Sequence, residues 1–149
     1  MSIQDVIDQE GGPAVVIESH LSVEDAINLM TEKDLSAVIV IEGNRPVGIF
    51  TERDVLLSYA RSGKRPFKEI EMRSAMTNKL IVARPEDDID ATLSLMIQTG
   101  IRHIPVIDGG EIVSLISICD LAHHQVGTLS TELHYLEEYV NDLHEAGRD

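Results

Sequence analysis

The chain has 149 residues, of which 43% are hydrophobic and 26% charged, as is typical of one soluble domain or two small units sharing a core. A formal net charge of −14 and an aromatic content of 3% disfavour nucleic-acid binding, because phosphates are repelled and few rings are available to stack on bases. No apolar run approaches the ~18 residues that span a bilayer, and the acidic start differs from a secretion signal. Cys119 is the only cysteine, which excludes an internal disulfide. We therefore expect a cytoplasmic protein with no membrane and no nucleic-acid partner.

The charge is distributed unevenly along the chain. Between Arg45 and Arg84, nine basic residues outnumber four acidic ones, so this stretch carries +5 (9 − 4) and the rest of the chain −19 (−14 − 5). A local positive zone in an acidic protein suits a small anion better than a long polyanion, because the surrounding negative field repels the remainder of a long ligand. A basic, solvated linker is the alternative interpretation.

The chain repeats itself at an offset of 66 residues, since residues 20–55 align without a gap with residues 86–121. Identical pairs include Leu29/Leu95, Met30/Met96, Val40/Val106, Gly43/Gly109 and Asp54/Asp120. A long period that occurs only twice does not fit a solenoid. We therefore expect two similar units packed about a pseudo-twofold axis.

The first copy begins with a predicted strand at residues 15–17, a short β-branched run. Ser22 and Asp25 then approximate a capping box, and the residues that follow are apolar at helical spacing. A hairpin with a glycine-containing turn is predicted over residues 37–50, and a second helix near Thr51. The first unit is therefore a strand, a helix, a hairpin and a helix.

The second copy repeats this order, with a lead strand at residues 80–82, a helix after Pro85, a hairpin over residues 104–116 and a helix near Ser117. Residues 61–66, which combine Gly, Pro and charge, are the predicted linker between the copies.

A hydroxyl followed three residues later by a carboxylate stands at the end of each predicted hairpin. Thr51 with Asp54 and Ser117 with Asp120 fit a capping box, which stabilises a helix start by about 1 kcal/mol. The same groups could bind a ligand, because a helix N-terminus favours anions and a carboxylate accepts two hydrogen bonds from a vicinal diol such as ribose. Both interpretations can hold together.

Two blocks, GIFTERD at residues 48–54 and IRHIPVID at residues 101–108, carry a family resemblance, supported by Ala75-Met76-Thr77 and by residues 83–87. Together they resemble a tandem pair of cystathionine-β-synthase (CBS) domains over about residues 13–126. The resemblance implies an α/β (α+β) fold of two β-α-β-β-α units. It also implies two clefts for AMP, ADP, ATP or S-adenosylmethionine, and a sensing role rather than catalysis.

By the same resemblance, Thr51 with Asp54 and Ser117 with Asp120 hold ribose and phosphate in the two clefts. Phosphate-facing side chains would be Arg53 in the first copy and Arg102 and His103 in the second. The other binding residues that the resemblance implies, for the apolar walls, the adenine edge and the phosphate, are Val16, Val38, Ile39, Val82, Arg84, Ile104 and Pro105.

The first copy departs from the family pattern at three places. It lacks the Met-Thr lead, reading DQEGGP at residues 8–13, and it has Ser36 and Ala37 where the second copy has Arg102 and His103. We therefore expect the second copy to be better equipped for phosphate.

In the second copy, Ser114 replaces the glycine that Gly48 provides in the first, which would crowd a ligand near the backbone.

The C-terminal stretch, residues 128–149, is predicted to form an acidic amphipathic helix. Its apolar residues are spaced 4, 3, 4, 3 and are Leu129, Leu133, Leu136, Val140 and Leu143. Two heptads are too short for a stable isolated coiled coil, so this seam packs on the protein's own body or across a dimer. The predicted division is residues 1–62 for the first CBS motif, 63–127 for the second and 128–149 for this helix.

Three functions remain open at this point. The first is a free-standing regulatory module, expected to be a homodimer, that binds adenosine-containing ligands and acts on an unknown regulated protein. The second is a structural or protein-interaction module without a ligand. The third is a metal-dependent enzyme using Cys119 and His123, although Asp120 and His124 project away from that pair on a helix. No catalytic motif and no obligatory cofactor are expected.

Overall fold

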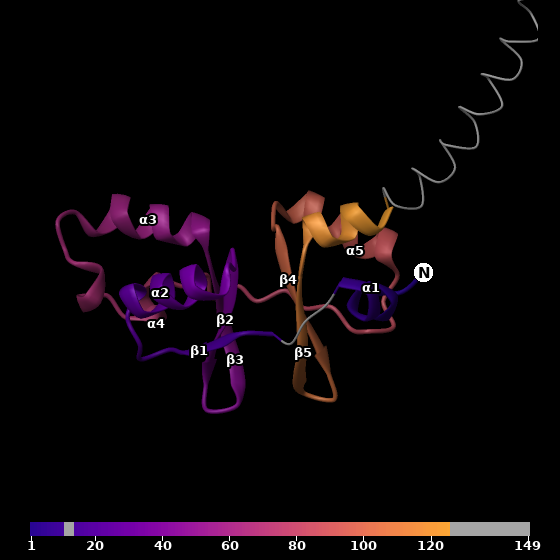
Figure 1. Cartoon of the computed structure of the whole chain (residues 1–149), viewed down its shortest axis with the longest axis horizontal. Coiled ribbons are helices and arrows are strands. Elements are labelled where there is room, and N and C mark those ends of the chain that lie inside the picture. The colour runs from indigo at the N-terminus through magenta and orange to yellow at the C-terminus, as the bar shows by residue number, and fades with distance from the viewer. Residues whose placement is uncertain (11–13, 126–149) are drawn as a thin grey trace, which may run out of the picture.

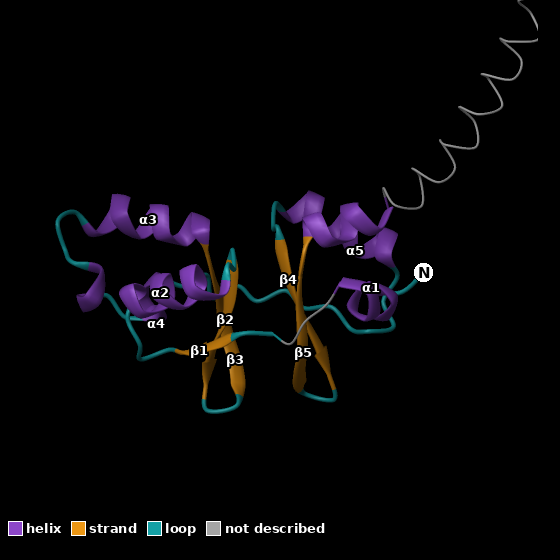
Figure 2. Ribbon diagram, viewed as in Figure 1, coloured by secondary structure: helices purple, strands orange, loops and turns teal. Residues whose placement is uncertain are grey.

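The computed structural model describes residues 1–10 and 14–125, so the predicted helix at residues 128–149 lies outside the described part. Two hairpins lie next to each other at the centre, and the helices lie on their outer sides (Figure 1). Figure 2 shows a similar arrangement in each half, with a hairpin flanked by helices. The mixed α/β class and the two similar units are therefore confirmed. Within the described residues, no helix is both long enough and apolar enough to span a membrane.

The first half contains five elements in the predicted order. They are β1 (Val16–Glu18), α2 (Val23–Lys33), β2 (Ala37–Glu42), β3 (Arg45–Thr51) and α3 (Glu52–Ser62). β1 runs parallel to β2, and β2 runs antiparallel to β3. The capping box at Ser22 and Asp25 is confirmed, because each residue bonds the other's backbone N–H. β1 begins one residue later than predicted.

The second half contains α5 (Ile89–Thr99), β4 (His103–Asp108), β5 (Glu111–Ser117) and a helix from residue 118 to the end of the described part at 125. The hairpins match at the offset of 66, since Ala37 pairs with Thr51 and His103 with Ser117. Even the register shift recurs, after Val40 in one hairpin and Val106 in the other. The repeat in sequence is therefore a repeat in backbone geometry.

The predicted lead strand at residues 80–82 is wrong. In this region only Ala83 pairs with the sheet, in parallel with Val106. The N–H of Ala83 donates to the carbonyl of Pro105, and the N–H of Ile107 donates to the carbonyl of Ala83, both at 2.9 Å. The second half therefore has a two-stranded sheet where the first has three strands.

Two prolines explain this difference. In the first half, Ile39 and Ser19 donate backbone N–H bonds of 3.1 Å and 2.9 Å that extend the ladder at its two ends. The residues 66 positions later are Pro105 and Pro85. Proline has no N–H to donate, so both end bonds are lost and the segment before Ala83 stays outside the sheet.

Each half also carries a lead helix that the sequence did not predict. These are α1 (Ile3–Glu10) and α4 (Met72–Ala75), the latter preceded by the short helix η1 (Phe67–Glu69). Their backbone bonds match: Ile3 and Gln4 donate to Asp87 and Pro85, as Met72 and Arg73 donate to Leu21 and Ser19. Ile3 and Met72 are 69 residues apart (72 − 3), whereas their acceptors are 66 apart (87 − 21). An ungapped alignment at 66 therefore misses the lead helix of the first copy.

The two lead helices are exchanged between the halves. Ile3 and Val6 of α1 are buried against Met96 and Ile104 in the core of the second half. Ile70 and Met72, which belong to the second motif in the predicted division, are buried in the core of the first half. The packing thus crosses the predicted boundary after residue 62, and each half needs a segment of the other to close its core.

Candidate functional site

A cavity of about 730 Å³ lies between the two halves, within the range of roughly 300–1,000 Å³ usual for small-molecule sites. Its walls come from the end of β3 and the start of α3, from residues 77–81, and from the segment between α5 and β4. The lining residues are Ser36, Ile49, Thr51, Glu52, Arg53, Asp54, Leu56, Leu57, Thr77, Lys79, Leu80, Ile81, Thr99, Gly100, Ile101, Arg102, His103 and Pro105. Both repeats therefore contribute to one site.

Thr51 and Asp54 form the predicted capping box at the start of α3. Oδ2 of Asp54 accepts bonds from the N–H of Thr51 at 2.9 Å and from its hydroxyl at 3.2 Å, and the N–H of Asp54 donates to Oγ1 of Thr51 at 3.3 Å. The second carboxylate oxygen, Oδ1, accepts from the hydroxyl of Thr77 at 3.0 Å. Asp54 is 5% exposed, so its carboxylate is held by internal donors at the cavity wall.

The segment Met76–Thr77 is pressed against β3 at Gly48. Ile49 and Thr77 exchange two backbone bonds of 2.9 Å. A Cβ on Gly48 would lie 2.6 Å from Sδ of Met76 and 2.7 Å from the carbonyl oxygen of Thr77. A glycine is therefore required at this position for the close approach of the segment. The space beside Gly48 is filled by Met76 and Thr77.

The backbone of residues 78–82 has no hydrogen-bond partner among the described residues. Leu80 and Ile81, within this segment, line the cavity. Pro105 accounts for one of these groups, because it has no N–H to donate to the carbonyl of Ile81 as Ile39 donates to Val15. The cavity is thus bordered by backbone donors and acceptors that are available to a ligand.

His103 connects the halves at the other side of the cavity. Its Nε2 lies 2.8 Å from Oγ of Ser36, and its side chain is half-buried. Burial lowers the pKa of His103 below the usual 6.5, while the nearby carboxylates of Asp120 and Glu52 act in the opposite direction. The imidazole is therefore mainly neutral near pH 7.

Six of the residues that the family resemblance indicated line the cavity: Thr51, Arg53, Asp54, Arg102, His103 and Pro105. Arg102 and His103, which the sequence assigned to the second copy's cleft, line the same cavity as Thr51 and Asp54 of the first copy. The cavity does not include Val16, Val38, Ile39, Val82, Arg84, Ile104, Ser117 or Asp120. Of these, Val38, Ile39 and Ile104 are fully buried in the protein.

Ser117 and Asp120 form the second predicted capping box. The N–H of Ser117 donates to Oδ2 of Asp120 at 2.9 Å, and the N–H of Asp120 donates to Oγ of Ser117 at 3.0 Å. Asp120 is only half-buried, and within the described residues no donor to its Oδ1 is recorded. The two repeat-related carboxylates therefore differ in how completely they are satisfied.

The group of Cys119, His123 and His124 is not arranged as a metal site. Nδ1 of His124 lies 2.7 Å from Oε1 of Gln9, on α1, and the ring is buried. Over residues 1–10 and 14–125, no three His, Cys, Asp or Glu side chains are close enough together to hold a metal ion.

The model of the CBS domain matches the chain twice, over residues 3–61 and 68–127. The chain therefore belongs to the CBS-domain family, as a tandem pair. It is 35% identical over 124 residues to the mitochondrial CBS domain-containing protein CBSX3 of Arabidopsis thaliana, covering 80% of this chain and 60% of that protein. A relative from Methanopyrus kandleri is covered over 63% of its length, so the chain spans somewhat less than two thirds of these two proteins.

Solved structures agree with this assignment. The CBS-domain containing protein ATU1752 from Agrobacterium tumefaciens superposes with a TM-score of 0.79 at 25% identity, over 84% of this chain and 99% of that one. The CBS domain pair of protein MJ0100, solved in complex with 5′-methylthioadenosine and S-adenosyl-L-methionine, has a TM-score of 0.76 at 18% identity, over 86% of this chain and 98% of that one. At that identity the second likeness shows the fold alone.

Several lining residues were missed from the sequence, above all Thr77, Lys79 and Leu80. Thr77 belongs to the Met-Thr lead quoted for the resemblance, which was the one available signal. No spacing rule places that lead against Asp54, because the contact depends on how the two halves pack. Arg102 lines the cavity of the first copy rather than that of the second for the same reason, because its position depends on how the two halves pack.

Proposed function

We propose that this chain is a regulatory module that binds an adenosine-containing ligand in the cavity between its two CBS motifs. The supporting observation is that one cavity combines three chemistries: apolar walls such as Ile49, Ile101 and Pro105, unpaired backbone at Leu80 and Ile81, and the carboxylate of Asp54 at a helix start. An apolar slot suits a purine ring, unpaired backbone suits its polar edge, and a carboxylate suits a ribose diol.

The start of α3 adds a place for negative charge. In its first turn the N–H groups of Glu52 and Asp54 are used, by the carbonyl of Ser36 and by Thr51, whereas the structure records no acceptor for the N–H of Arg53 among the described residues. Orphan N–H groups at the start of an 11-residue helix favour an anion. The complex of protein MJ0100 with two adenosyl compounds supports the same ligand class.

The module acts by sensing rather than by catalysis. The cavity is built from both halves, and these halves share α1 and α4, so a ligand that changes their spacing changes the shape of the whole pair. Regulation requires that the ligand bind one shape more tightly than the other. The proposal includes a cytoplasmic location and a target protein that receives this change.

Self-association is a further part of the proposal. Leu56 and Tyr59, three residues apart on α3, are each 72% exposed, and Leu56 also lines the cavity; exposed apolar side chains can contribute to a protein-protein contact. The related CBS-CP12 protein from bloom-forming cyanobacteria is hexameric. We expect a homodimer of this chain, which sedimentation equilibrium measures directly.

Thermal melting with a panel of ligands tests the function. AMP, ADP, ATP, S-adenosylmethionine and 5′-methylthioadenosine are added to the wild type, Asp54→Asn and Asp120→Asn. A ligand at 100 times its Kd stabilises the fold by about 2.7 kcal/mol, which is several degrees for a domain of this size. We expect a shift that Asp54→Asn abolishes and Asp120→Asn retains. No shift with any of the five would contradict the proposal and favour the alternative, an interaction module without a ligand.

A further inference from the structure

A cluster of positive charge lies at one end of the molecule, where α3 leads through a loop into η1 (Figure 1). This basic segment, residues 61–68, contains four basic residues and no acidic one. The four are Arg61, Lys64, Arg65 and Lys68, and all are exposed. The segment carries +4 in a chain of net charge −14, and none of its residues lines the cavity. Its charge is therefore separate from the ligand site.

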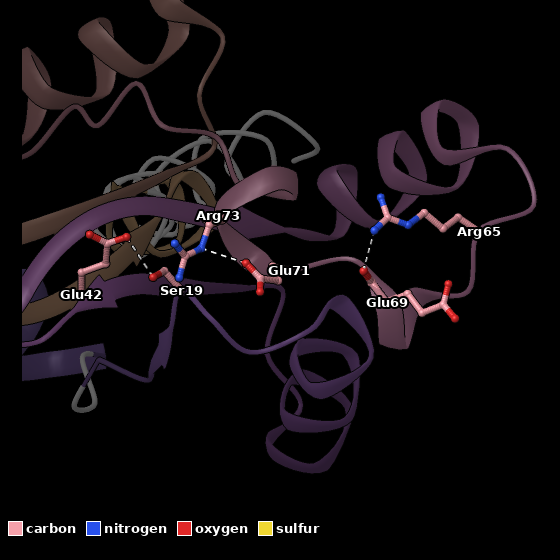
Figure 3. A network of polar contacts seen from close by, with 6 residues as sticks. All are labelled: Ser19, Glu42, Arg65, Glu69, Glu71 and Arg73. Atoms are coloured by element: carbon pink, nitrogen blue, oxygen red, sulfur yellow. Dashed lines mark hydrogen bonds and ion pairs between the residues drawn. The ribbon is translucent and has the colours of Figure 1, made fainter.

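Neighbouring carboxylates do not neutralise the basic segment. The one ion pair recorded in the described part of the chain joins Arg73 to Glu71 at 2.9 Å, outside the segment. Arg65 donates to the backbone carbonyl of Glu69 at 3.0 Å, and the Glu69 carboxylate extends away from the guanidinium (Figure 3). A carbonyl group holds the Arg65 side chain in place without cancelling its charge. All four cations thus remain available to an acidic partner.

The corresponding part of the second copy carries the opposite charge. At the offset of 66, the basic segment corresponds to residues 127–134, which contain no Lys or Arg. The C-terminal segment that the sequence predicts as an acidic helix, residues 128–149, has six acidic residues and one basic residue, a net charge of −5 (1 − 6). It lies outside the described residues. Equivalent places in the two repeats therefore differ in the sign of their charge.

Exposed apolar side chains on α3 lead up to the basic segment. Leu56 and Tyr59 are each 72% exposed, and their spacing of three residues places them on one face of the helix. Arg61 follows in the last turn. The C-terminal segment has a complementary composition, since acidic residues accompany its apolar seam. An amphipathic helix binds through its apolar side while its charges meet opposite charges at the rim, so the two surfaces match in both respects.

The ends of the molecule favour a second copy of the chain as the source of the acidic segment. The basic segment lies at one end of the long axis in Figure 1, and the described chain stops at residue 125 nearer the other end. A twofold axis that places a second copy antiparallel to the first brings the end of each chain next to the basic segment of the other. Such a dimer closes with two identical contacts.

We infer that residues 128–149 of one copy bind the basic segment and the exposed face of α3 on a second copy. This inference rests on the homodimer included in the proposed function and names the contact that holds it, but it does not depend on a ligand in the cavity. Because the charges are exposed, the contact weakens as salt is added.

Sedimentation equilibrium of the full chain tests the inference with a loop variant, Lys64→Glu with Lys68→Glu. The matched control, Lys33→Glu with Arg45→Glu, changes the net charge by the same amount at exposed positions outside the basic segment and the cavity. We expect the loop variant to weaken the Kd of the dimer by about tenfold and the control to leave it within about twofold. An equal loss in the control would assign the effect to net charge and overturn the contact.

A tail variant, Glu137→Lys with Glu138→Lys, identifies which chain supplies the acidic segment. Alone it is expected to weaken the dimer about as much as the loop variant does. An equimolar mixture of the two variants should recover the wild-type Kd, because the C-terminal segment of each chain then meets the opposite charge on its partner. Circular dichroism checks that both variants stay folded.

The outcomes separate this inference from the proposed function. A dimer of unchanged strength in the loop and tail variants would overturn the contact and leave a homodimer formed through another surface. Recovery only when both reversals are in the same chain would overturn the second copy as the occupant, because each C-terminal segment would then bind its own chain. A wild type that is monomeric at every concentration would overturn both the contact and the homodimer, whereas the ligand panel tests the cavity separately.

Discussion

The hydroxyl of Thr77 lies 3.0 Å from Oδ1 of Asp54 and donates to it. Thr77 belongs to the segment that follows α4, and Asp54 belongs to α3, so the bond fastens the connection between the repeats to the wall of the cavity. A ribose diol that binds this carboxylate has to compete with Thr77. The contact therefore links occupancy of the site to the position of the segment that leads into the second half.

Thr77→Val removes this donor while keeping the shape of the side chain. The buried Oδ1 of Asp54 is then short of a partner, so the free energy of unfolding falls by about 1–2 kcal/mol. A ribose hydroxyl supplies the missing donor, so the rise in Tm on adding the ligand becomes larger than in the wild type. Thr99→Val is the control, because the hydroxyl of Thr99 lines the same cavity but donates to the carbonyl of Leu95. An equal ligand-induced rise in Thr77→Val and the wild type would contradict competition at Asp54.

The lowered pKa of His103 predicts a pH-dependent stability. The unfolded chain takes up a proton near pH 6.5, which the native imidazole resists because it is buried. The unfolded state then binds more protons, so the free energy of unfolding falls as the pH is lowered from 6.5 through the folded pKa of His103. Urea denaturation at a series of pH values measures this loss. His103→Gln is expected to flatten that part of the curve.

The same residue predicts a pH-dependent affinity of opposite sign. A phosphate beside His103 favours the charged imidazole and raises its pKa. ATP is therefore expected to bind more tightly as the pH falls through the pKa that His103 has in the complex towards its lowered pKa in the ligand-free protein. Titration calorimetry in buffers of different ionisation enthalpy would also show proton uptake on binding. Unchanged ATP affinity in this range, or an identical dependence in His103→Gln, would place the phosphate away from His103.

The exchange of α1 and α4 predicts which half of the protein is destabilised by a substitution in either helix. Ile3 and Met72 are fully buried, so replacing either with Ala costs about 2–5 kcal/mol. Ile3→Ala is expected to speed native-state hydrogen exchange mainly in β4, and Met72→Ala mainly in β2, each in the half that receives the helix. Ile97→Ala is the control, because Ile97 is 64% exposed and the change in stability should stay within about 0.5 kcal/mol. Equal acceleration in both hairpins for both variants would argue against separate cores.

Much of the local structure could be predicted from the sequence, because its causes lie within a few residues. Ser22 with Asp25 and Thr51 with Asp54 bond one another across three positions, and the glycine turns close hairpins of adjacent strands. The offset of 66 carried these predictions from one half to the other. The predicted third strand of the second half was an exception. It is absent because Pro85 and Pro105, both visible in the sequence, lack the N–H groups on which that strand depends.

The arrangement of the site could not be predicted in the same way. The contact of Thr77 with Asp54 and the presence of Arg102 and Thr51 in the lining of one cavity depend on the packing of the two halves. Likewise, α1 is bonded to residues 85 and 87 at the far side of the repeat. The offset changes from 66 to 69 between the lead helix and the rest of the copy, and the ungapped comparison conceals this relation.

Central to this account is an adenine nucleotide bound between the Thr51–Asp54 helix start and the backbone at Ile81. Titration of the ¹⁵N-labelled protein with ATP, followed by amide chemical shifts, tests it most directly. The account predicts that the largest changes occur at Thr51, Arg53, Ile81 and Arg102, with weaker changes at Ser117 and Asp120. No saturable change, or changes centred on Ser117 and Asp120 while these four amides stay fixed, would contradict it.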